Sequence, residues 1–432
     1  MEKIAFSLDY NLKMTAVHYR VILICFLMNM TDGMNVMTIS YTSNAILSDW
    51  KLDSSTFGTV FSAGLFGMAL GAMFLASKAD VIGRKPMILL CAIWMCCGSL
   101  LTAYSQSFGQ LVLLRFFTGI GIGSMLACTS TMVSEYAPAK TKNFWVSFVM
   151  AGYPLGAVLS GLAAKNLIQE YGWMSVYLLA GILTMLTIPL CYFFLEESIE
   201  FLVKKQPNKA LVRVNKVLSA MKLESISFLP PIAQNKKSSN VVALFKTETR
   251  HSTLLVWTAF LMCFATLYFL TSWIPKLASI AGLSAELAIF AGIIFNLGAF
   301  VGIITEGYLS AVFGLRKIIS AFLLSTALLM IGFGFVTGTF QTLVLFGCIG
   351  FGMQGGFIGL YAVAARIYDT EIRSTGIGWA IGFGRFGAIL GPLVGGVLIS
   401  NGWSVPLNFI AFAVPVAAAA IVTLFIKSPN LA

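Results

Sequence analysis

Twelve apolar stretches, each long enough to cross a lipid bilayer, set the strongest limit on the fold of this 432-residue chain. A helix needs about 20 apolar residues to cover the hydrocarbon core, where every backbone polar group must be paired internally. The expected helices cover residues 21–46, 57–77, 86–104, 109–132, 144–166, 173–195, 253–275, 287–309, 317–336, 342–365, 375–399 and 404–426. We therefore expect an all-α integral membrane protein.

Composition agrees with this expectation. Hydrophobic residues make up 58% of the chain and charged residues 10%, and a soluble chain of this length cannot bury so much apolar surface. A net charge of +11 could indicate a nucleic-acid-binding protein. The basic residues, however, follow the positive-inside rule, by which lysine and arginine gather in the cytoplasmic loops of membrane proteins. Of the 28 basic residues, three lie in loops on one side and two lie inside helices, which leaves 23 on the other side. We expect that side, with both termini, to be cytoplasmic, and we expect no nucleic-acid partner.

The two halves of the chain repeat one another at a shift of 231 residues. At this shift six pairs of glycines coincide: Gly67 with Gly298, Gly71 with Gly302, Gly83 with Gly314, Gly119 with Gly350, Gly121 with Gly352, and Gly156 with Gly387. One constant shift across separate segments predicts two parallel six-helix bundles, with a substrate site between them near the middle of the membrane. We place the bundles at 1–195 and 253–432. The cytoplasmic linker between them, 196–252, should hold an amphipathic helix.

Few groups in this sequence can carry chemistry inside a membrane. The eight cysteines lie in apolar segments without metal-ligand spacing, and both histidines lie outside those segments. We therefore expect no metal site, no disulfide and no cofactor. Proton transfer within the membrane would have to use carboxylates. The sequence has no phosphate-binding loop and no hydrolase or zinc-protease motif, so an enzyme is the least favoured class.

A charged pattern follows the second apolar stretch, in "SKADVIGRKP". It reads D-x-x-G-R-K and comprises Asp80, Gly83, Arg84 and Lys85. It resembles the signature of the major facilitator superfamily, and the resemblance implies that these four residues latch one conformation. The second copy, "SAVFGLRK", has Ala311 in place of the acid, so its latch should be weaker.

Other segments resemble the aromatic acid:proton symporter family of that superfamily, and the resemblance covers essentially the whole chain. They are "TDGMN", "RFFTGIGIG" with "SEYAP", "YFLTSWIPKLASIAGLS" and "IRSTGIGWAIGFGRFGAILGP". "EESIEFL" is similar to a motif that follows the sixth helix in aromatic-acid and sugar-porter-like members, with Glu197 and Ser198 kept. In "TDGMN", Asp32 and Gly33 match the family pattern, while Asn35 replaces a second aspartate. The resemblance implies a transporter that works by alternating access.

Arg385 lies near the middle of the eleventh apolar stretch, among several glycines. A guanidinium stays protonated and must find a partner or water. Its position in the repeat corresponds to Pro154, so the repeat does not require it. A planar fork of donors suits a carboxylate, and we interpret Arg385 as the substrate anchor. The alternative is a structural arginine bonded to helix carbonyls.

Asp32 lies in the first apolar stretch, where an apolar environment disfavours its charged form, and it is our candidate for the proton-coupling acid. Simple pairing with a buried arginine is the alternative. Asn35, one turn later, cannot titrate but could bind a substrate hydroxyl. The resemblance links Arg115 to proton coupling, and a purely structural role is equally open.

Glu135 and Arg366 coincide at the shift of 231 residues, and we interpret them as gate charges at the cytoplasmic face. Glu135 also counts among the proton-coupling candidates. Glu306 is a further gate candidate.

Aromatic and amide groups are expected to shape the substrate cavity. Gln354, Phe357 and Tyr361 share one face of the tenth helix, where aromatic rings could stack on a ring substrate or simply pack. Further substrate-binding candidates on the seventh and eighth helices are Tyr268, Trp273 and Asn296.

These features together favour a proton-coupled importer of small organic anions in a bacterial inner membrane. Aromatic carboxylates of the benzoate or hydroxybenzoate type are the preferred substrates, and nicotinate, muconate or a sugar acid are alternatives. The expected partners are the carboxylate, protons and lipid, with no obligate protein partner. A fixed arginine disfavours export of cationic drugs. A membrane sensor that binds a ligand without moving it remains a separate hypothesis.

Overall fold

The computed structural model describes residues 14–138, 141–231, 244–245, 250–336, 338–368 and 373–426. Within these residues every regular element is a helix, and twelve helical segments are long and apolar enough to span a membrane. The all-α prediction with twelve spans is therefore confirmed. Both termini lie outside the described residues, and their cytoplasmic location stays a prediction.

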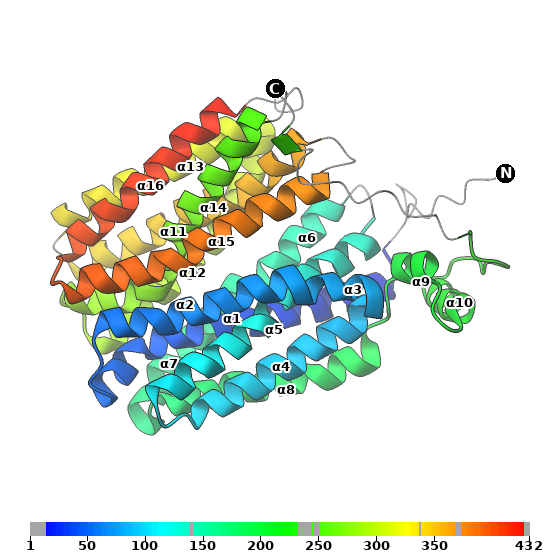
Figure 1. Ribbon diagram of the computed structural model, residues 1–432, viewed down its shortest axis with the longest axis horizontal. Coiled ribbons are helices and arrows are strands. Elements are labelled where there is room, and N and C mark those ends of the chain that lie inside the picture. The colour runs from blue at the N-terminus through cyan, green and yellow to red at the C-terminus, as the bar shows by residue number, and fades with distance from the viewer. Residues whose placement is uncertain are drawn as a thin grey trace.

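The spans form two sets of six, which Figure 1 shows below and above a central division. The first set contains α1 (Ala16–Asp49), α2 (Ser54–Leu70) with η1 (Gly71–Leu75) and α3 (Ala76–Ile82), α4 (Arg84–Ala103), α5 (Phe108–Tyr136), α6 (Lys142–Met150) with α7 (Gly152–Tyr171), and α8 (Met174–Phe194). The second contains α11 (Arg250–Ile280), α12 (Ala285–Phe313), α13 (Leu315–Gly332) with η3 (Phe333–Phe335), α14 (Thr339–Ile367), α15 (Arg373–Ser400) and α16 (Val405–Phe425).

The linker between the two sets differs from its prediction. Instead of one amphipathic helix it contains two short ones, α9 (Ile199–Lys205) and α10 (Ala210–Ala220), beside one end of the first set (Figure 1). Pro207 lies between them and cannot donate a helical hydrogen bond, and Gln206 and Lys209 adopt left-handed backbone conformations. The predicted linker "PPIAQNKKSSN" lies outside the described residues from position 232 onward.

Glycine contacts recur in both sets at the spacing of the sequence repeat. A Cβ atom on Gly67 would overlap the carbonyl oxygen of Phe116, and a Cβ on Gly298 would overlap that of Gly347. Both members of the second contact lie 231 residues after those of the first. The same backbone approach thus joins α2 to α5 and α12 to α14, which explains why glycine occurs at the repeated positions.

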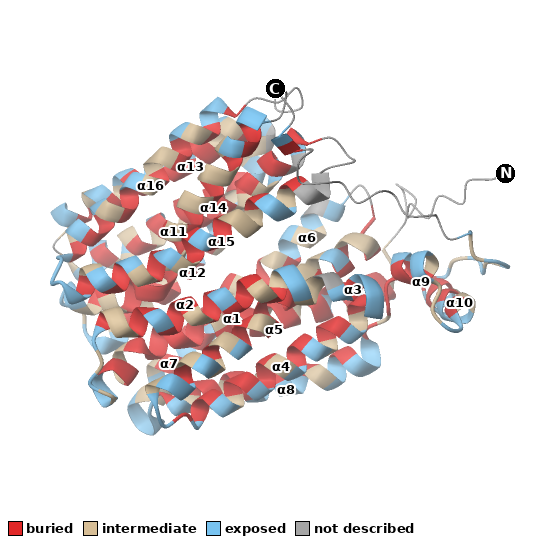
Figure 2. Ribbon diagram, viewed as in Figure 1, coloured by how far each residue is buried: buried red, intermediate tan, exposed pale blue. Residues whose placement is uncertain are grey.

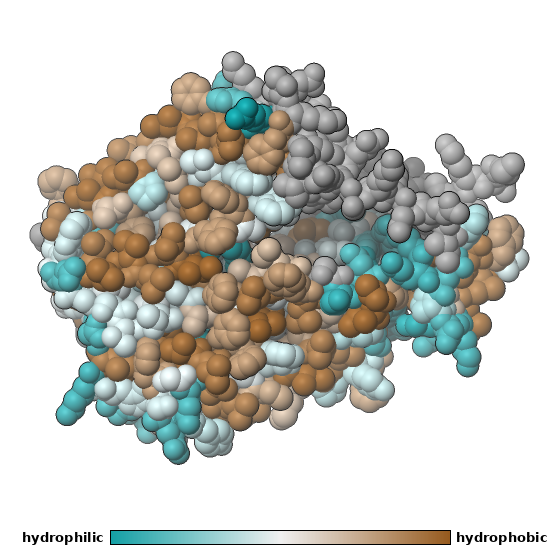
Figure 3. Space-filling model, in the orientation of Figure 1, coloured by the Kyte–Doolittle hydropathy of each residue, from teal (hydrophilic) through white to brown (hydrophobic). Residues whose placement is uncertain are grey.

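Apolar side chains cover the outside of both sets, as contact with lipid requires (Figure 3). The most buried span is α1, in which 72% of the most apolar 18-residue segment is buried inside the molecule (Figure 2). Since α1 packs against α5, α7 and α8 and also against α11, it lies at the junction of the two sets. Polar groups on α1 are therefore well placed for a central site.

Hydrogen bonds join the two sets toward the end that lies opposite α9 and α10 (Figure 1). The Ser40 hydroxyl donates to the backbone oxygens of Thr271 (2.7 Å) and Ser272 (2.9 Å), and the Ser62 hydroxyl donates to that of Ile389 (2.7 Å). If the termini are cytoplasmic, this closed end is the outer end of the protein.

Further polar contacts lie at the same end. Asn44 Nδ2 donates to the Ser279 hydroxyl at 2.9 Å, and Lys165 pairs with Glu286 at 2.5 Å.

Asp53 caps α2 at this closed end. Its carboxylate accepts hydrogen bonds from the Ser55 hydroxyl and from the backbone N–H groups of Ser55 (3.1 Å) and Thr56 (3.2 Å). These bonds, with that of the Ser55 side chain contributing most, hold the pKa of Asp53 below its usual range. The Ser55 N–H also donates to the Ser400 hydroxyl at 2.7 Å, so the cap is part of the contact between the two sets.

Candidate functional site

Arg385 is buried on α15 and faces aromatic side chains of α11. Its side chain is only 7% exposed, its Nη1 donates to the Tyr268 hydroxyl at 3.3 Å, and its Cζ lies 5.4 Å from the ring centroid of Phe264. A Cβ on Gly387 would overlap the carbonyl oxygen of Leu261, so glycine lets α15 approach α11 closely here. No carboxylate forms an ion pair with Arg385 within the described ranges.

Asp32 lies on the opposite side of the central division, on α1. It is 1% exposed, and neither carboxylate oxygen has a hydrogen-bond partner in the part of the chain that the structure describes. Its charge interacts with that of Arg385. The structure thus brings together the two residues that the sequence predicts as proton acceptor and anion anchor, one from each set of helices.

Tyr153, at the start of α7, lies beside these two groups and was not predicted from the sequence. It is close enough to interact electrostatically with Asp32, Arg385 and Tyr268. A Cβ on Gly33 would overlap the Tyr153 carbonyl oxygen, so this glycine lets α7 approach α1 next to Asp32. The sequence repeat offered one indication of its position. Tyr153 directly precedes Pro154, the residue of the first half that corresponds to Arg385.

Arg115 and Asn35 meet one helical turn further along α1. Arg115 is 4% exposed, its Nη2 donates to the backbone oxygen of Asn35 at 3.1 Å, and its Cζ lies 5.9 Å from the ring centroid of Tyr177. The Asn35 amide donates to the backbone oxygen of Thr31 (2.8 Å) and to the Thr184 hydroxyl (3.0 Å). The Asn35 amide hydrogens are thus used within the first set.

A cavity lies between the two sets at this depth. Its empty space, including the part open to solvent, is about 410 Å³. Arg115 of α5 lines one wall, and Tyr268 of α11, the partner of Arg385, lines another. The remaining lining residues are Val36, Met37, Ile39, Ser40, Val60, Phe61, Gly64, Leu65, Met68, Gly119, Ile122, Thr271 and Ser272. The wall is mostly apolar with a few hydroxyl groups, as in many small-molecule sites.

The predicted aromatic face of the tenth helix is packed inside the second set. Phe357 is 5% exposed, and its ring centroid lies 4.7 Å from that of Phe264 and 5.5 Å from that of Tyr361. Phe260 closes this cluster, with its ring centroid 5.2 Å from that of Tyr361. In this conformation Phe357 therefore supports Phe264, the ring beneath Arg385, and Tyr361 is itself within electrostatic reach of Arg385.

Three other predicted lining residues are buried. Asn296 donates to the backbone oxygen of Gly292 at 2.9 Å, and Trp273 Nε1 donates to that of Pro392 at 2.9 Å. Gln354 is 8% exposed on α14. None of the three lines the cavity described above, so their contact with a substrate stays a prediction.

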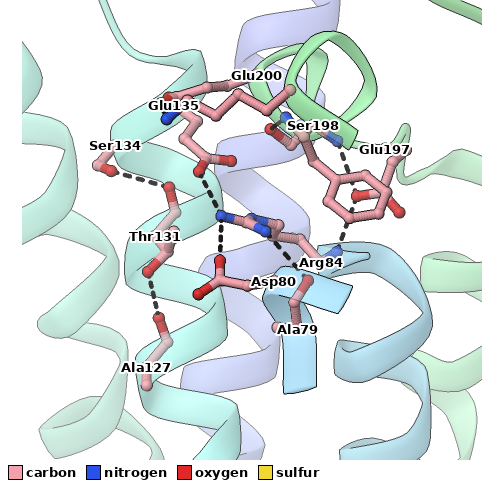
Figure 4. Close-up of polar contacts among 12 residues, drawn as sticks. Ala79, Asp80, Arg84, Ala127, Thr131, Ser134, Glu135, Glu197, Ser198 and Glu200 are labelled. Carbon is pink, nitrogen blue, oxygen red and sulfur yellow. Dashed lines mark hydrogen bonds and ion pairs between the residues drawn. The ribbon is translucent and has the colours of Figure 1, made fainter. Parts of the chain in front are cut away.

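The predicted latch residues form a compact cluster where α3 and the start of α4 meet the last turn of α5 (Figure 4). Arg84 pairs with Asp80 at 2.8 Å and with Glu135 at 3.0 Å, and its Nη1 donates to the backbone oxygen of Ala79 at 3.1 Å. Gly83 has a φ of 110°, which favours glycine, and it separates α3 from α4. Glu135 therefore lies with the latch and not with Asp32.

Glu197 completes this cluster and was noted in the sequence only as part of a motif. Its Oε1 accepts hydrogen bonds from the backbone N–H groups of Arg84 (2.9 Å), Lys85 (3.3 Å) and Ser198 (2.9 Å) (Figure 4). The carboxylate thus caps the N-terminus of α4, which favours negative charge. Tyr136 also donates to the Glu197 backbone oxygen at 2.7 Å, which fixes the start of the linker to the first set.

The corresponding region of the second set is built differently. Arg316 Nη1 donates to the backbone oxygen of Ile426 at 2.6 Å, so this arginine binds the end of α16. Arg366 is exposed in the last turn of α14. Glu306 is 4% exposed on α12, and its Oε1 has no hydrogen-bond partner among the described residues. The gating roles of Arg366 and Glu306 stay predictions.

The chain matches known proteins over nearly its whole length. A sequence model of the Major Facilitator Superfamily matches residues 22–306 and 292–431. The chain is 32% identical to the 4-hydroxybenzoate transporter PcaK of Acinetobacter baylyi, covering 94% of this chain and 90% of that protein. It is 31% identical to the benzoate transport protein of the same species, covering 96% and 90%. The fold also matches the xylose transporter XylE from E. coli in its inward-open conformation, with a TM-score of 0.74 and 17% identity over 96% of this chain and 98% of that one.

Proposed function

This chain belongs to the major facilitator superfamily, and we propose that it is a proton-coupled importer of small aromatic carboxylates of the benzoate and hydroxybenzoate type. It is a multi-pass membrane protein whose relatives are named as transporters and not as enzymes. In the proposed cycle the two sets of helices open the central site alternately to each side of the membrane.

The observation that carries this proposal is the environment of Arg385. The guanidinium is buried, bonded to one phenol and stacked over one aromatic ring of α11, within electrostatic reach of Asp32 of the first set, and it has no ion-pair partner in the described ranges. Such an arginine favours a planar anion that can accept two parallel hydrogen bonds. The ring of an aromatic acid would then lie near Phe264 and Tyr268, which already stack on each other at 5.9 Å.

Proton coupling follows from an exchange of partners at Arg385. Without substrate, the carboxylate of Asp32, when it is ionised, interacts with Arg385 across the central division. A substrate carboxylate that binds Arg385 takes over this role, and Asp32 is then left in a buried site without hydrogen bonds from described residues. Uptake of a proton by Asp32 removes the cost of that unpaired charge. Substrate and proton therefore bind together.

The test is uptake of labelled benzoate and 4-hydroxybenzoate into proteoliposomes under an inward proton gradient. We expect Arg385→Gln to reduce concentrative uptake by about two orders of magnitude, because it removes a buried charged contact. The matched control is Arg213→Gln, since Arg213 is an exposed arginine on α10. Protein-free liposomes correct for leakage of the neutral acid through lipid.

Unchanged uptake by correctly folded Arg385→Gln protein would contradict the anchor role. If the wild type binds ring acids but accumulates none, the protein is a sensor. If it transports only nicotinate, muconate or a sugar acid, the carboxylate anchor stands and the aromatic specificity is wrong.

A further inference from the structure

The second buried arginine, Arg115, has no acidic partner although it lines the central cavity. It forms no ion pair within the described residues, and its Nε and Nη1 have no hydrogen-bond partner there. Only its Nη2 is satisfied, by the backbone oxygen of Asn35. A guanidinium cannot lose its proton, and an unpaired one in the membrane interior is unfavourable.

The neighbouring side chains do not supply the missing charge. Asn35 is neutral, and its amide hydrogens are bonded to Thr31 and Thr184. The ring of Tyr177 contributes a cation–π contact at 5.9 Å, which is weaker than a charge pair. Asp32, the nearest acid along α1, interacts with Arg385. Arg115 is therefore a cationic group with unused donors at the wall of a cavity.

The balance of charge decides what kind of ligand fits. The central site holds Arg115, Arg385 and Asp32, so its net charge is +1 when Asp32 is ionised and +2 when Asp32 carries a proton. In the proton-loaded state a monocarboxylate neutralises only Arg385. A second carboxylate on the same ligand would neutralise Arg115 as well.

The positions of the two arginines are compatible with one ligand between them. Arg115 lines the cavity from α5, and Tyr268, which accepts a hydrogen bond from Arg385, lines it from α11. Asn35, whose carbonyl binds Arg115, follows Asp32 by three residues, a rise of about 4.5 Å along the helix. Arg115 thus borders the cavity directly from the first set of helices, and Arg385 lies behind Tyr268 on the side of the second set.

We propose that Arg115 forms a second carboxylate subsite, so that the central site prefers a dicarboxylate with a flat, unsaturated or aromatic body between its two acid groups. This inference rests on the proposed function, because it assumes that Arg385 binds the first carboxylate. It also gives Arg115 a direct role in binding the substrate in place of a role in proton transfer.

The experiment measures binding by calorimetry to the purified full-length protein in chloride-free buffer, with benzoate, terephthalate and cis,cis-muconate as probes. We expect at least one of the two dicarboxylates to bind at least about tenfold more tightly than benzoate, because it gains a charge-assisted contact.

The decisive variant is Asn35→Asp, which is almost the same size and places a carboxylate beside Arg115. We expect it to abolish the preference for the dicarboxylate, because the new carboxylate takes the place of the ligand's second acid group beside Arg115. As a second pair, Arg115→Gln should lose the preference and Arg115→Lys should retain part of it.

The outcomes distinguish failure of the second subsite from failure of the proposed function. If the wild type binds benzoate as tightly as both dicarboxylates, or if Asn35→Asp keeps a dicarboxylate preference, the second subsite is wrong and the aromatic-acid function stands. If the wild type binds none of the three acids, the proposed function itself is wrong. If added chloride stabilises the wild type but not Asn35→Asp and removes the preference, the occupant of the subsite is a free inorganic anion and not part of the substrate.

Discussion

In the proposed mechanism, two groups of opposite charge on different halves of the molecule, Asp32 and Arg385, make up the chemical centre of this protein. Each is buried, and each would be costly to leave unpaired in the membrane interior. Because they come from different sets of helices, any motion that separates the sets also changes the partner of each charge. A substrate carboxylate can therefore influence both the protonation of Asp32 and the position of the helices.

Replacement of the acid tests this coupling. In the Asp32→Asn variant we expect substrate binding to become independent of pH between 6 and 8, whereas wild-type affinity should fall by up to about tenfold per pH unit as the linked proton becomes scarce. Proteoliposome uptake by this variant should no longer respond to a proton gradient. Uptake that is still driven by the gradient would exclude Asp32 from the proton path.

Asp53→Asn is the matched control. Hydrogen bonds hold the pKa of Asp53 below its usual range, so this carboxylate is charged from pH 6 to 8 in both the folded and the unfolded chain. The stability it contributes is present above the usual range and is lost only as the pH falls through the lowered pKa. We therefore expect Asp53→Asn to leave the pH profile of transport unchanged.

Helix contacts in both halves depend on glycine at the repeated positions. A side chain at Gly67 or Gly298 would overlap a backbone carbonyl of the neighbouring helix, and a backbone atom cannot rotate away.

Sequence periodicity predicted the spans, and the constant shift of 231 residues predicted the two sets. It did not predict the break between α9 and α10, because the apolar pattern continues across Pro207 while the backbone cannot.

Alanine substitutions test these contacts. We expect Gly67→Ala and Gly298→Ala each to lower the free energy of unfolding by about 1–3 kcal/mol, because the added methyl group forces two helices apart. The control is Gly307→Ala, since a Cβ on Gly307 would meet nothing within 4 Å. That variant should be as stable as the wild type or slightly more stable, because alanine favours the helix. Thermal unfolding in detergent measures all three, and equal losses would show that the repeated contacts have no special importance.

The whole molecule is closed at one end, where hydroxyl and amide groups of α1 and α2 form hydrogen bonds with α11 and α15.

Many residues of the candidate site can be predicted from the sequence, because charges such as Arg385 and Asp32 stand out in apolar stretches. The sequence does not predict which of these residues lie close together, since that depends on which helices pack against one another. Glu135, expected both as a gate charge and as a proton-coupling candidate, lies with Arg84, and Tyr153 was not predicted although it lies beside Asp32.

A crosslink across the closed end tests whether the two sets must separate there. Asn44 and Ser279 are in direct contact, at 2.9 Å, and we expect a disulfide in the Asn44→Cys/Ser279→Cys variant to stop transport reversibly while ligand binding persists. The exposed cysteines Cys97 and Cys348 are first replaced by serine, and each single cysteine variant is the control. Transport that continues at the wild-type rate after complete crosslinking would show that this end need not open.

The contacts at the closed end are unequal in one respect. Ser40 and Ser62 donate through their side chains, whereas Thr271, Ser272 and Ile389 accept through the main chain. Every amino acid has a carbonyl group, so substitutions on the accepting side leave the bond intact, while most substitutions on the donating side remove it. A scan of single substitutions should therefore find Ser40 and Ser62 intolerant and their acceptors Thr271, Ser272 and Ile389 permissive. Over evolutionary time these three positions of the second half can change their side chains while the hydrogen bonds that hold the end closed persist.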